Sequence, residues 1–477
     1  MIRSVEHPVT WKAIYKRISF MGNPEKGAIE VLNQWENEGK SVTKWELSRV
    51  VKEMRKYGSY KLALEIYKWM NNRPERFRIS SSDAAIQLDL VSKVHGISGA
   101  EDYFKNIPNK LLDNRVYGSL LNAYVRARML EKAESLLVEM KNKDYARHAL
   151  PFNVMMNLYT SLKNQEKVES LVSEMMENKI DLDLYSYNIW ISSRGSLGSV
   201  EKMEEVYEKL ILDGSVNPDW TTYSRMATLY IKNKEFEKAK DCLRKVETLI
   251  TNRDRIPYHY LLTHYGGIGE KKEVQRIWES YKTIFPYIPN TAYQAIISSF
   301  IRMDDIEESE HLYEEWVSRK SSFDARIGNL LLGWYVRNEL VEKAESFLEE
   351  MLKVGKPNSN TWEIVAEGHI KEQRVSDALS CFEKALSDET SSFWRPKPVN
   401  IELLYNICEQ KNDEESKEAL FEVLRKAQVL EDEVYMSLVP FYKLSKSENG
   451  SQKVKESEGG YEEEAADMLL NELQTSI

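Results

Sequence analysis

The amino-acid sequence predicts an all-α protein built as a solenoid of about eleven helix-turn-helix repeats. Two segments carry this prediction: residues 131–140 read EKAESLLVEM and residues 342–351 read EKAESFLEEM. They are identical at eight of ten positions and lie 211 residues apart, close to six periods of 35 residues. A unit that recurs at this spacing is typical of stacked supersecondary repeats. The same frame returns at residues 166–175, 201–210, 237–246 and 307–316.

Eleven units follow when each is aligned on a central small residue, seven positions before a terminal Met, Trp or Leu. In the fourth unit, apolar residues recur every three to four positions from Val116 to Tyr124 and again from Ala133 to Met140, which predicts two helices. The connection between them is short, so we expect them to pack antiparallel. The units begin, at spacings of 33 to 37 residues, at Val9, Lys44, Ser81, Asn114, Ala149, Leu184, Trp220, Arg255, Asn290, Ala325 and Ser359.

The central small residue predicts close packing of the two helices of a unit. The terminal Met or aromatic residue is expected to fill the space to the next unit. Proline followed by Asp or Asn separates several units, as at Pro218 and Asp219, because Pro stops one helix and a short polar residue caps the next. The small residues are Ala28, Ala63, Ala100, Ala133, Ala239, Ala344 and Ala378.

The sequence also predicts where the repeats begin and end. We expect a short N-terminal segment over residues 1–8, the repeat solenoid over residues 9–397 and divergent C-terminal helices over residues 398–444. Residues 445–477 hold 3 Lys against 8 acidic residues, and they contain long stretches without aliphatic side chains. This composition predicts a flexible acidic tail, with a short helix in the segment that begins at Ala465.

The chain is acidic overall, with a formal net charge of -10, but its charge is unevenly distributed. Residues 1–80 hold 16 Lys and Arg against 9 Glu and no Asp, a net charge of +7. The acidic tail carries -5, so the middle of the chain carries -12. The basic end permits a nucleic-acid partner, against which the total charge alone would argue.

Cysteine usage and hydropathy indicate the compartment. Cys242, Cys381 and Cys408 form no CxxC pair and no even set, which favours a reducing compartment and a role in packing. No apolar run is long enough for a membrane helix, and no segment resembles a secretory signal. Residues 1–20 carry four basic residues against Glu6, which is compatible with the remnant of an organellar presequence. The repeat frame begins at about Val9, however, so a clear transit peptide is not seen.

Motifs for common catalytic chemistry are absent from the sequence. It contains no Walker loop, no GxSxG or HExxH motif, and no H-x-E followed by the spaced CxxC of a zinc deaminase. His259 and His264 lie five residues apart without a third ligand nearby, so we predict no zinc site there. Asp304 and Asp305 lie in the turn of the ninth unit and are expected to cap a helix. We therefore predict a protein without catalytic residues, metal, cofactor or small-molecule substrate.

Several repeats share a short sequence pattern near the start of their first helix. An early Tyr is followed by a small polar residue, as in Tyr187-Asn188 and Tyr223-Ser224, and residues 180–188 and 215–224 read IDLDLYSYN and SVNPDWTTYS. No Leu-Gly recurs at the tetratricopeptide spacing. Over about residues 9–393 the chain resembles the pentatricopeptide repeat family, most of all its plain-repeat class from plant organelles. The resemblance implies a right-handed α–α superhelical solenoid that binds single-stranded RNA in its concave groove, one nucleotide per repeat.

The resemblance assigns base reading to the residue after the early aromatic and to the last residue of the same unit. A short amide or hydroxyl can hydrogen-bond a base edge while the second polar group orients it. The alternative is that these residues only cap helices. Asn153 with Asp183 and Asn188 with Asp219 match the uracil-preferring combination, and Ser224 with Asp254 and Asn329 with Asn358 match it more loosely.

Four other units depart from this small polar pattern. We therefore expect a short target of consecutive specified bases, such as a UU step. The alternative is that some repeats contact another partner. The departing residues are Gly118 and His148 in the fourth unit, His259 in the eighth, Gln294 with Asp324 in the ninth, and Glu363 in the eleventh.

The thirteenth residue of the unit, at the end of the first helix, is basic in seven of eleven units. The resemblance implies that such a row contacts RNA phosphates. Cations also favour helix C-termini, by roughly 0.3 to 1 kcal/mol each, but this preference does not explain the fixed register. The basic row consists of Lys56, Lys93, Arg126, Lys232, Arg302, Arg337 and Lys371.

These observations predict a non-enzymatic, sequence-tolerant single-stranded RNA-binding factor of the mitochondrion, or alternatively of the chloroplast. It would occupy an organellar transcript and so affect its processing, stability or translation. The alternative is a protein-interaction scaffold or an accessory subunit of the mitochondrial ribosome. The acidic middle favours the scaffold, whereas the basic row favours RNA. We expect no membrane partner.

Overall fold

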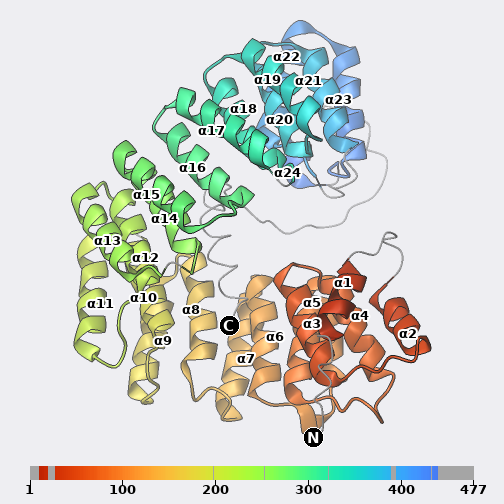
Figure 1. Cartoon of the computed structure of the whole chain (residues 1–477), viewed down its shortest axis with the longest axis vertical. Coiled ribbons are helices and arrows are strands. Elements are labelled where there is room, and N and C mark those ends of the chain that lie inside the picture. Colours follow the sequence, from red (N-terminus) through yellow and green to blue (C-terminus); the bar gives the residue numbers. More distant parts are fainter. Residues whose placement is uncertain are drawn as a thin grey trace, which may run out of the picture. The chain divides into compact units, whose positions relative to one another are not determined.

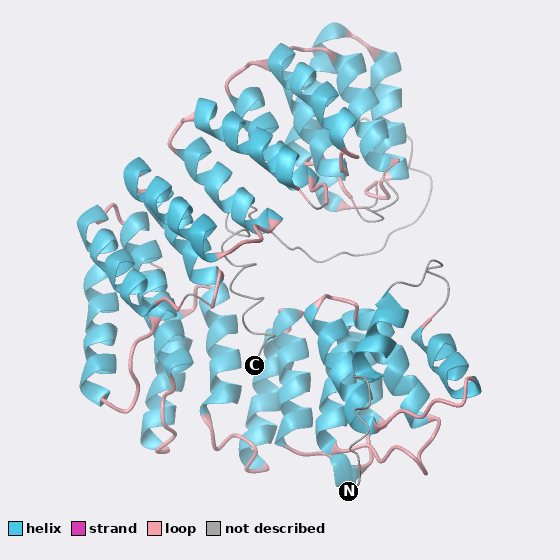
Figure 2. Cartoon of the chain, in the orientation of Figure 1, coloured by secondary structure: helices cyan, strands magenta, loops and turns pink. Residues whose placement is uncertain are grey.

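The computed structural model describes residues 10–19, 27–196, 198–251, 253–320, 322–387, 394–430 and 432–438. Within these residues the chain forms 24 α-helices and one 3-10 helix, and it contains no strand (Figure 2). The predicted N-terminal segment over residues 1–8, the acidic tail over residues 445–477 and the helix predicted from Ala465 lie outside the described residues.

The helices follow one another as the predicted pairs (Figure 1). The first helices are α1 (Thr10–Ser19), α3 (Lys44–Lys56), α5 (Ser81–Lys105), α6 (Asn114–Arg126), α8 (Ala149–Ser161), α10 (Leu184–Gly195), α12 (Trp220–Lys232), α14 (Ile256–Gly267), α16 (Asn290–Arg302), α18 (Ala325–Arg337) and α20 (Ser359–Lys371). The second helices are α2 (Ala28–Asn37), α4 (Tyr60–Asn71), α7 (Leu130–Asn142), α9 (Gln165–Glu177), α11 (Val200–Asp213), α13 (Phe236–Leu249), α15 (Lys271–Ile284), α17 (Ile306–Arg319), α19 (Val341–Val354) and α21 (Val375–Leu386). The remaining elements are η1 (Asn109–Leu111), α22 (Pro398–Lys411), α23 (Glu414–Lys426) and α24 (Glu433–Leu438).

Nine of the eleven first helices begin at the residue that the sequence predicts, and α1 and α14 begin one residue later. Short polar residues fix these starts. Thr43, Ser80, Asp183 and Asn358 each accept the backbone N–H three residues further on, and the third residue returns a hydrogen bond. Asp305 caps α17 by accepting the N–H of Glu308, so the capping role predicted for this residue is confirmed.

The third repeat has both of its helices in α5 because the chain turns at a single residue. Gly96 lies at φ 72° and ψ -171°, a conformation that residues with a Cβ rarely adopt. A Cβ at Gly96 would meet no atom within 4 Å, so the backbone angle, and not crowding, requires glycine there.

A residue with positive φ lies in the turn between the two helices of ten successive repeats. In eight of these repeats the next residue donates its N–H five positions back, as from Met129 to the carbonyl of Tyr124 at 3.0 Å, which closes the end of the first helix. Six of the ten turn residues are not glycine, and each holds a conformation that costs roughly 1–2 kcal/mol. The ten are Gly58, Gly96, Arg128, Lys163, Gly198, Lys234, Gly269, Asp304, Glu339 and Gln373.

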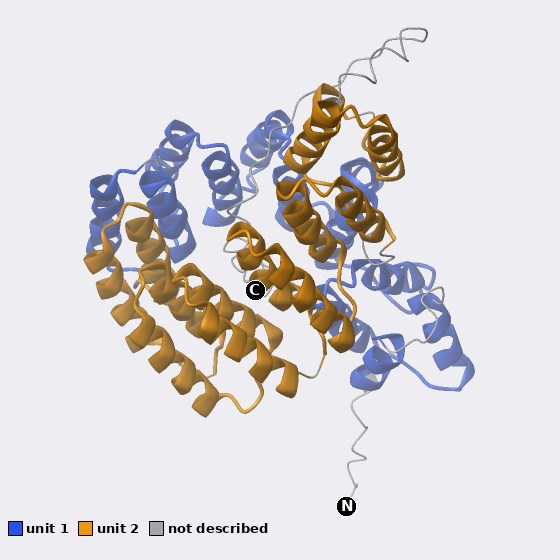
Figure 3. Cartoon of the chain, turned by 90° about the horizontal axis from the view of Figure 1, so that it is seen from above, with its two compact units in different colours: residues 1–217, 459–477 blue, residues 218–458 orange. Residues whose placement is uncertain are grey.

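The chain divides into two compact units between Asn217 and Pro218 (Figure 3). In the first unit α6 packs against α5, α7 and α8, and in the second unit α16 packs against α14, α17 and α18. Each of these first helices contacts its own second helix and the first helices of neighbouring repeats. This is the stacking of a helical-repeat solenoid, so the predicted fold class is confirmed. In the C-terminal part α22 packs against α20, α21 and α23, and the predicted boundary at residue 398 stays a prediction.

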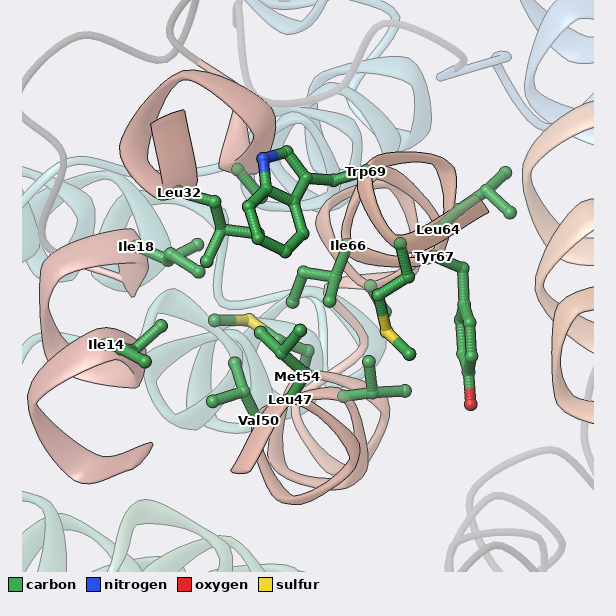
Figure 4. Packing of buried hydrophobic residues seen from close by; sticks show 14 of the residues in the cluster. Ile14, Ile18, Leu32, Leu47, Val50, Met54, Leu64, Ile66, Tyr67 and Trp69 are labelled. Atoms are coloured by element: carbon green, nitrogen blue, oxygen red, sulfur yellow. The ribbon is translucent and has the colours of Figure 1, made fainter. Parts of the chain in front are cut away.

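The core is built from the positions that the sequence predicts. All seven central alanines are at most 1% exposed, and the terminal residues Met140, Met351 and Trp316 are fully buried. Figure 4 shows how Ile14 of α1, Val50 of α3 and other apolar residues of the first two repeats point toward one another. The three cysteines are buried too, which agrees with the predicted packing role.

The fourth residue of the recurring segment, Glu134 in one repeat and Glu310 in another, connects its repeat to the next one in the same unit. Glu134 accepts hydrogen bonds from the hydroxyl of Tyr159 at 2.5 Å and from Nζ of Lys167 at 3.3 Å, both in the following repeat. In the second unit Glu310 accepts from the hydroxyl of Tyr335 at 2.6 Å. These bonds keep successive repeats in the same register, so equivalent residues of the first helices line up within each unit.

Candidate nucleic-acid interface

Asn153, the fifth residue of α8, lies beside Asp183, the N-cap of α10. Asn153 Nδ2 donates to Asp183 Oδ1 at 3.0 Å, and Ser186 Oγ lies 2.8 Å from Asn153 Oδ1. Asp183 Oδ1 also accepts the backbone N–H of Ser186 at 2.7 Å. Asp183 is exposed, but Asn153 is 1% exposed. Asp183 is therefore open to solvent, whereas neighbouring side chains cover the amide of Asn153.

Asn329 of α18 repeats this arrangement five repeats later. Its Nδ2 donates to Oδ1 of Asn358, the N-cap of α20, at 3.2 Å. The hydroxyl of Thr361 lies 2.7 Å from Asn329 Oδ1, and Asn358 Oδ1 accepts the N–H of Thr361 at 2.9 Å. Asn329 and Asn358 are both half-buried, so this cluster is the more accessible of the two amide clusters.

The other two predicted pairs differ. Asn188 and Asp219 lie in different compact units. Asn188 is buried, and Asp219 caps α12 by accepting the N–H groups of Thr221 and Thr222. Ser224 and Asp254 lie in the same unit without a hydrogen bond between them. Asp254 accepts the N–H of Ile256 at 3.0 Å instead.

Glu363 shows why the eleventh repeat departs from the small polar pattern. This carboxylate is 3% exposed and accepts the N–H of Lys397 at 2.5 Å and the indole N–H of Trp394 at 3.3 Å. Burial raises the pKa of Glu363, although these hydrogen bonds oppose the increase. Lys397 is the N-cap of α22, so Glu363 holds the start of the C-terminal helices.

Three of the other departing residues also have local explanations. His259 is buried against Tyr281, whose hydroxyl lies 3.3 Å from Nε2, and burial lowers the pKa of His259 to about 4. Asp324 caps α18 and pairs with Arg326 at 2.8 Å. A Cβ at Gly118 would meet no atom within 4 Å, so the fourth repeat has open space where Asn153 lies in the fifth.

In the first unit, part of the basic row converges on one carboxylate. Asp89 accepts from Nη1 of Arg126 at 2.9 Å and from Nη2 of Arg55 at 3.2 Å, and Lys93 Nζ lies 3.3 Å away. Burial raises the pKa of Asp89, but the three cations outweigh burial and hold it below its ordinary value. Burial also lowers the pKa of Lys93, despite Asp89. Lys56 is exposed at the end of α3.

The row has different surroundings in the second unit. Arg302 and Arg337 are exposed, and neither side chain makes a hydrogen bond or ion pair with the residues that the structure describes. Lys371 donates to the carbonyl of Val336 at 3.2 Å, and Lys232 is exposed. Arg302 and Arg337 are therefore exposed members of the row without a described carboxylate partner, as Lys56 is in the first unit, although burial lowers the pKa of Arg302.

An aromatic and cationic face on α1 and α3 was missed by the sequence prediction. The guanidinium of Arg49 lies 5.4 Å from the ring centre of Trp11 and 5.2 Å from that of Trp45. Trp45 is 62% exposed. The signal was present, because Trp45, Arg49, Lys52 and Lys56 recur at the spacing of one helical face. Exposed aromatic rings beside cations suit single-stranded nucleic acid.

The described residues contain no group of three His, Cys, Asp or Glu arranged to hold a metal ion. His264 is separate from His259: its Nδ1 lies 2.7 Å from the carbonyl oxygen of Tyr260, and its Nε2 lies 2.6 Å from the hydroxyl of Thr228. A search of the described helices for a long apolar segment that could span a bilayer finds none.

These features define an all-α repeat protein with polar side chains at equivalent positions of its first helices. A family model described as PPR repeat matches residues 115–145, 151–180, 185–215, 221–249, 291–321 and 329–355. A pentatricopeptide repeat-containing protein of Arabidopsis thaliana is 60% identical over 432 residues, which cover 90% of this chain and 82% of that protein. The chain belongs to the pentatricopeptide repeat family, as the sequence predicted.

Other relatives are also from Arabidopsis thaliana. The large ribosomal subunit protein mL101 (rPPR4) is 40% identical over 97% of this chain and 95% of its own length. A pentatricopeptide repeat-containing protein described as mitochondrial is 33% identical over 87% of this chain and 84% of its own length. Among solved structures, pentatricopeptide repeat protein PPR10 in complex with an 18-nt psaJ RNA element has a TM-score of 0.49 at 17% identity, covering 88% of this chain and 60% of that one.

Proposed function

We propose that this protein binds single-stranded RNA along its first helices, with no catalytic activity of its own. The recurrence of one hydrogen-bonded amide cluster, at Asn153 and at Asn329, is the observation that carries the proposal. Capping alone needs Asp183 and Asn358 but not the partner amides. Membership of the pentatricopeptide repeat family supports it.

In this proposal the eight predicted base-contacting residues and the basic row contribute unequally. Asn153 with Asp183 and Asn329 with Asn358 contact bases, and Arg302 and Arg337 contact phosphates. Lys93 and Arg126 contribute less, because Asp89 already pairs with both. The Trp11, Arg49 and Trp45 face provides stacking. Bound RNA is protected from nucleases or kept unpaired, so the action on a transcript is occupancy.

The proposed compartment is the mitochondrion, which one of the relatives carries in its name. The supporting sequence feature is the basic composition of residues 1–20, which hold four basic residues against Glu6. Expression of the chain with a C-terminal fluorescent tag in plant cells tests the assignment. Fluorescence that coincides with a mitochondrial marker is the expected result, and fluorescence in chloroplasts would replace it with the alternative compartment.

Binding of a uridine-rich single strand of about 20 nucleotides, followed by fluorescence anisotropy, tests RNA binding. The pair of substitutions Asn153→Ala and Asn329→Ala is expected to weaken binding about tenfold or more, because each removes at least one hydrogen bond to a base. Asn142→Ala is the matched control, since Asn142 is an exposed asparagine at the end of second helix α7. Absence of measurable binding by the unsubstituted protein at low salt would refute the proposal.

A second candidate function is that of an accessory subunit of an organellar ribosome. Its support is the 40% identity to a large ribosomal subunit protein along nearly the whole chain, together with the acidic middle. Sedimentation of organellar extracts separates the two candidates. Stable co-migration with the large subunit after RNase treatment of free transcripts favours the ribosomal function, whereas migration with light RNA-protein particles favours the transcript-binding function.

A further inference from the structure

The two amide clusters contain a third member that the base-reading prediction does not include. Ser186 and Thr361 are the third residues of α10 and α20, and both are fully buried. Each contributes its backbone N–H to the N-cap of its own helix and its hydroxyl to the amide of the preceding repeat. The same three roles thus recur in two repeats that are far apart in the sequence.

The capping bonds determine which way each amide faces. Asp183 Oδ1 and Asn358 Oδ1 accept a backbone N–H, so both atoms are acceptors. The amide group that faces them must therefore be the NH2 of Asn153 or Asn329, at 3.0 and 3.2 Å. A rotated amide would place two oxygen atoms against each other at that distance, which electrostatic repulsion opposes.

With the NH2 groups facing the caps, the amide oxygens face the hydroxyls. Ser186 Oγ lies 2.8 Å from Asn153 Oδ1, and Thr361 Oγ1 lies 2.7 Å from Asn329 Oδ1. An amide oxygen can only accept, so the hydroxyl is the donor in this contact. Each hydroxyl also lies 2.9 Å from the cap oxygen, Asp183 Oδ1 or Asn358 Oδ1, which competes for its single proton. Two hydrogen bonds, one through nitrogen and one through oxygen, then hold each amide in one orientation.

We propose that Ser186 and Thr361 are positioning residues that set the base preference of the fifth and tenth repeats. The inference rests on the proposed RNA-binding function. Each fixed amide retains one N–H donor and one oxygen lone pair, and the positions of this donor and this acceptor relative to each other are fixed. A base edge with an acceptor beside a donor, such as the carbonyl and N3–H of uracil, matches that arrangement. Without the hydroxyl, the amide loses one of its two restraints and is held through its nitrogen alone, so its oxygen is no longer fixed in position against a base edge.

The seventh repeat gives an internal contrast. The predicted base-contacting residues of this repeat are Ser224 and Asp254. Asp254 precedes Arg255, the N-cap of α14, and Pro257 follows it three positions later. Proline has neither a hydroxyl nor an N–H, so the three-membered cluster cannot form, and no hydrogen bond joins Ser224 to Asp254 among the described residues. We expect this repeat to discriminate bases less than the fifth and tenth repeats do.

Selection from a randomised RNA library by the full chain, followed by sequencing, tests the proposal. The variants are Ser186→Ala and Thr361→Val, each with a conservative partner that keeps the hydroxyl, Ser186→Thr and Thr361→Ser. The hydroxyl-free variants are expected to reduce discrimination at their own position about three- to tenfold, with average affinity changed less than about twofold. The conservative partners are expected to retain the discrimination. A merely structural role would lower affinity for all sequences equally.

Three outcomes decide the question, and thermal unfolding of every variant verifies that it is folded. Loss of discrimination in the hydroxyl-free variants alone supports the proposal. Unchanged discrimination in Ser186→Ala and Thr361→Val, while Asn153→Ala and Asn329→Ala alter it, overturns the positioning role and leaves RNA binding intact. No RNA selected by the unsubstituted protein would instead refute the proposed function, on which the positioning role depends. Because the two sites are separate, one variant that fails to fold leaves the other as the test.

Discussion

In the first unit Arg55, Lys93 and Arg126 share the carboxylate of Asp89, whereas in the second unit Arg302 and Arg337 make no side-chain hydrogen bond or ion pair with the described residues. Lys93, Arg126, Arg302 and Arg337 nevertheless occupy the same register of the repeat. The difference arises from one acidic residue in the third repeat. It teaches that register determines where a cation lies, while its neighbours determine whether it is available to RNA.

The largest change in stability is expected from Asp89→Asn, because this substitution leaves the three cations of the first unit without their shared carboxylate. We expect the free energy of unfolding at neutral pH to fall by about 1.5–3 kcal/mol, because hydrogen bonds to a charged group are lost in a half-buried site. Chemical denaturation measures it. Asp102→Asn is the control: Asp102 pairs with Lys105 in solvent, and we expect a change within about 0.5 kcal/mol. Equal losses in both variants would contradict the account.

The same site is expected to make stability depend on pH. The pKa of Asp89 is lower in the folded protein than the unfolded value of about 3.9. The negative charge of Asp89 therefore stabilises the fold at pH values above about 3.9, and this stabilisation is lost as the pH falls through the folded pKa. The difference in unfolding free energy between wild type and Asp89→Asn should therefore stay constant above about pH 5 and shrink below about pH 4. Denaturation at a series of pH values tests this, and a difference that grows on acidification would be inconsistent with the lowered pKa.

The helix positions could be predicted from the sequence because they depend on local signals. Polar caps and apolar periodicity fixed the starts of α3 and α20 to the residue. The resemblance to the pentatricopeptide repeat family paired Asn153 with Asp183 as base-contacting residues. Their side chains lie 3.0 Å apart, and base contact stays a prediction. The meeting of Arg55 and Arg126 at Asp89 could not be predicted, because it depends on the reach of side chains from three repeats. The hydroxyl contacts of Ser186 and Thr361 required the orientation of an amide, which residue spacing does not contain.

A smaller change in stability is expected from substitutions in the positive-φ turns, which both units contain. Lys163 in the first unit and Glu339 in the second lie in equivalent turns at φ 56° and 60°. Lys163→Gly and Glu339→Gly should each raise the unfolding free energy, by up to about 1 kcal/mol, because relief of the left-handed strain exceeds the entropy that glycine adds to the unfolded chain. Thermal unfolding measures both changes. Gly269→Ala is the reverse substitution in the same kind of turn and should destabilise. A stabilised Gly269→Ala variant would show that these turns are not strained.

The salt dependence of RNA affinity in two matched double variants tests the central claim most directly. Lys93→Gln with Arg126→Gln removes two cations of the first unit, and Arg302→Gln with Arg337→Gln removes two of the second. For single strands the slope of log affinity against log salt is about 0.7 per neutralised phosphate. We predict that the second-unit variant lowers the slope by about 1.4 and the first-unit variant by less than about 0.7. Equal reductions, or a slope that neither variant changes, would contradict the claim that neighbouring side chains decide which cations of the row meet RNA.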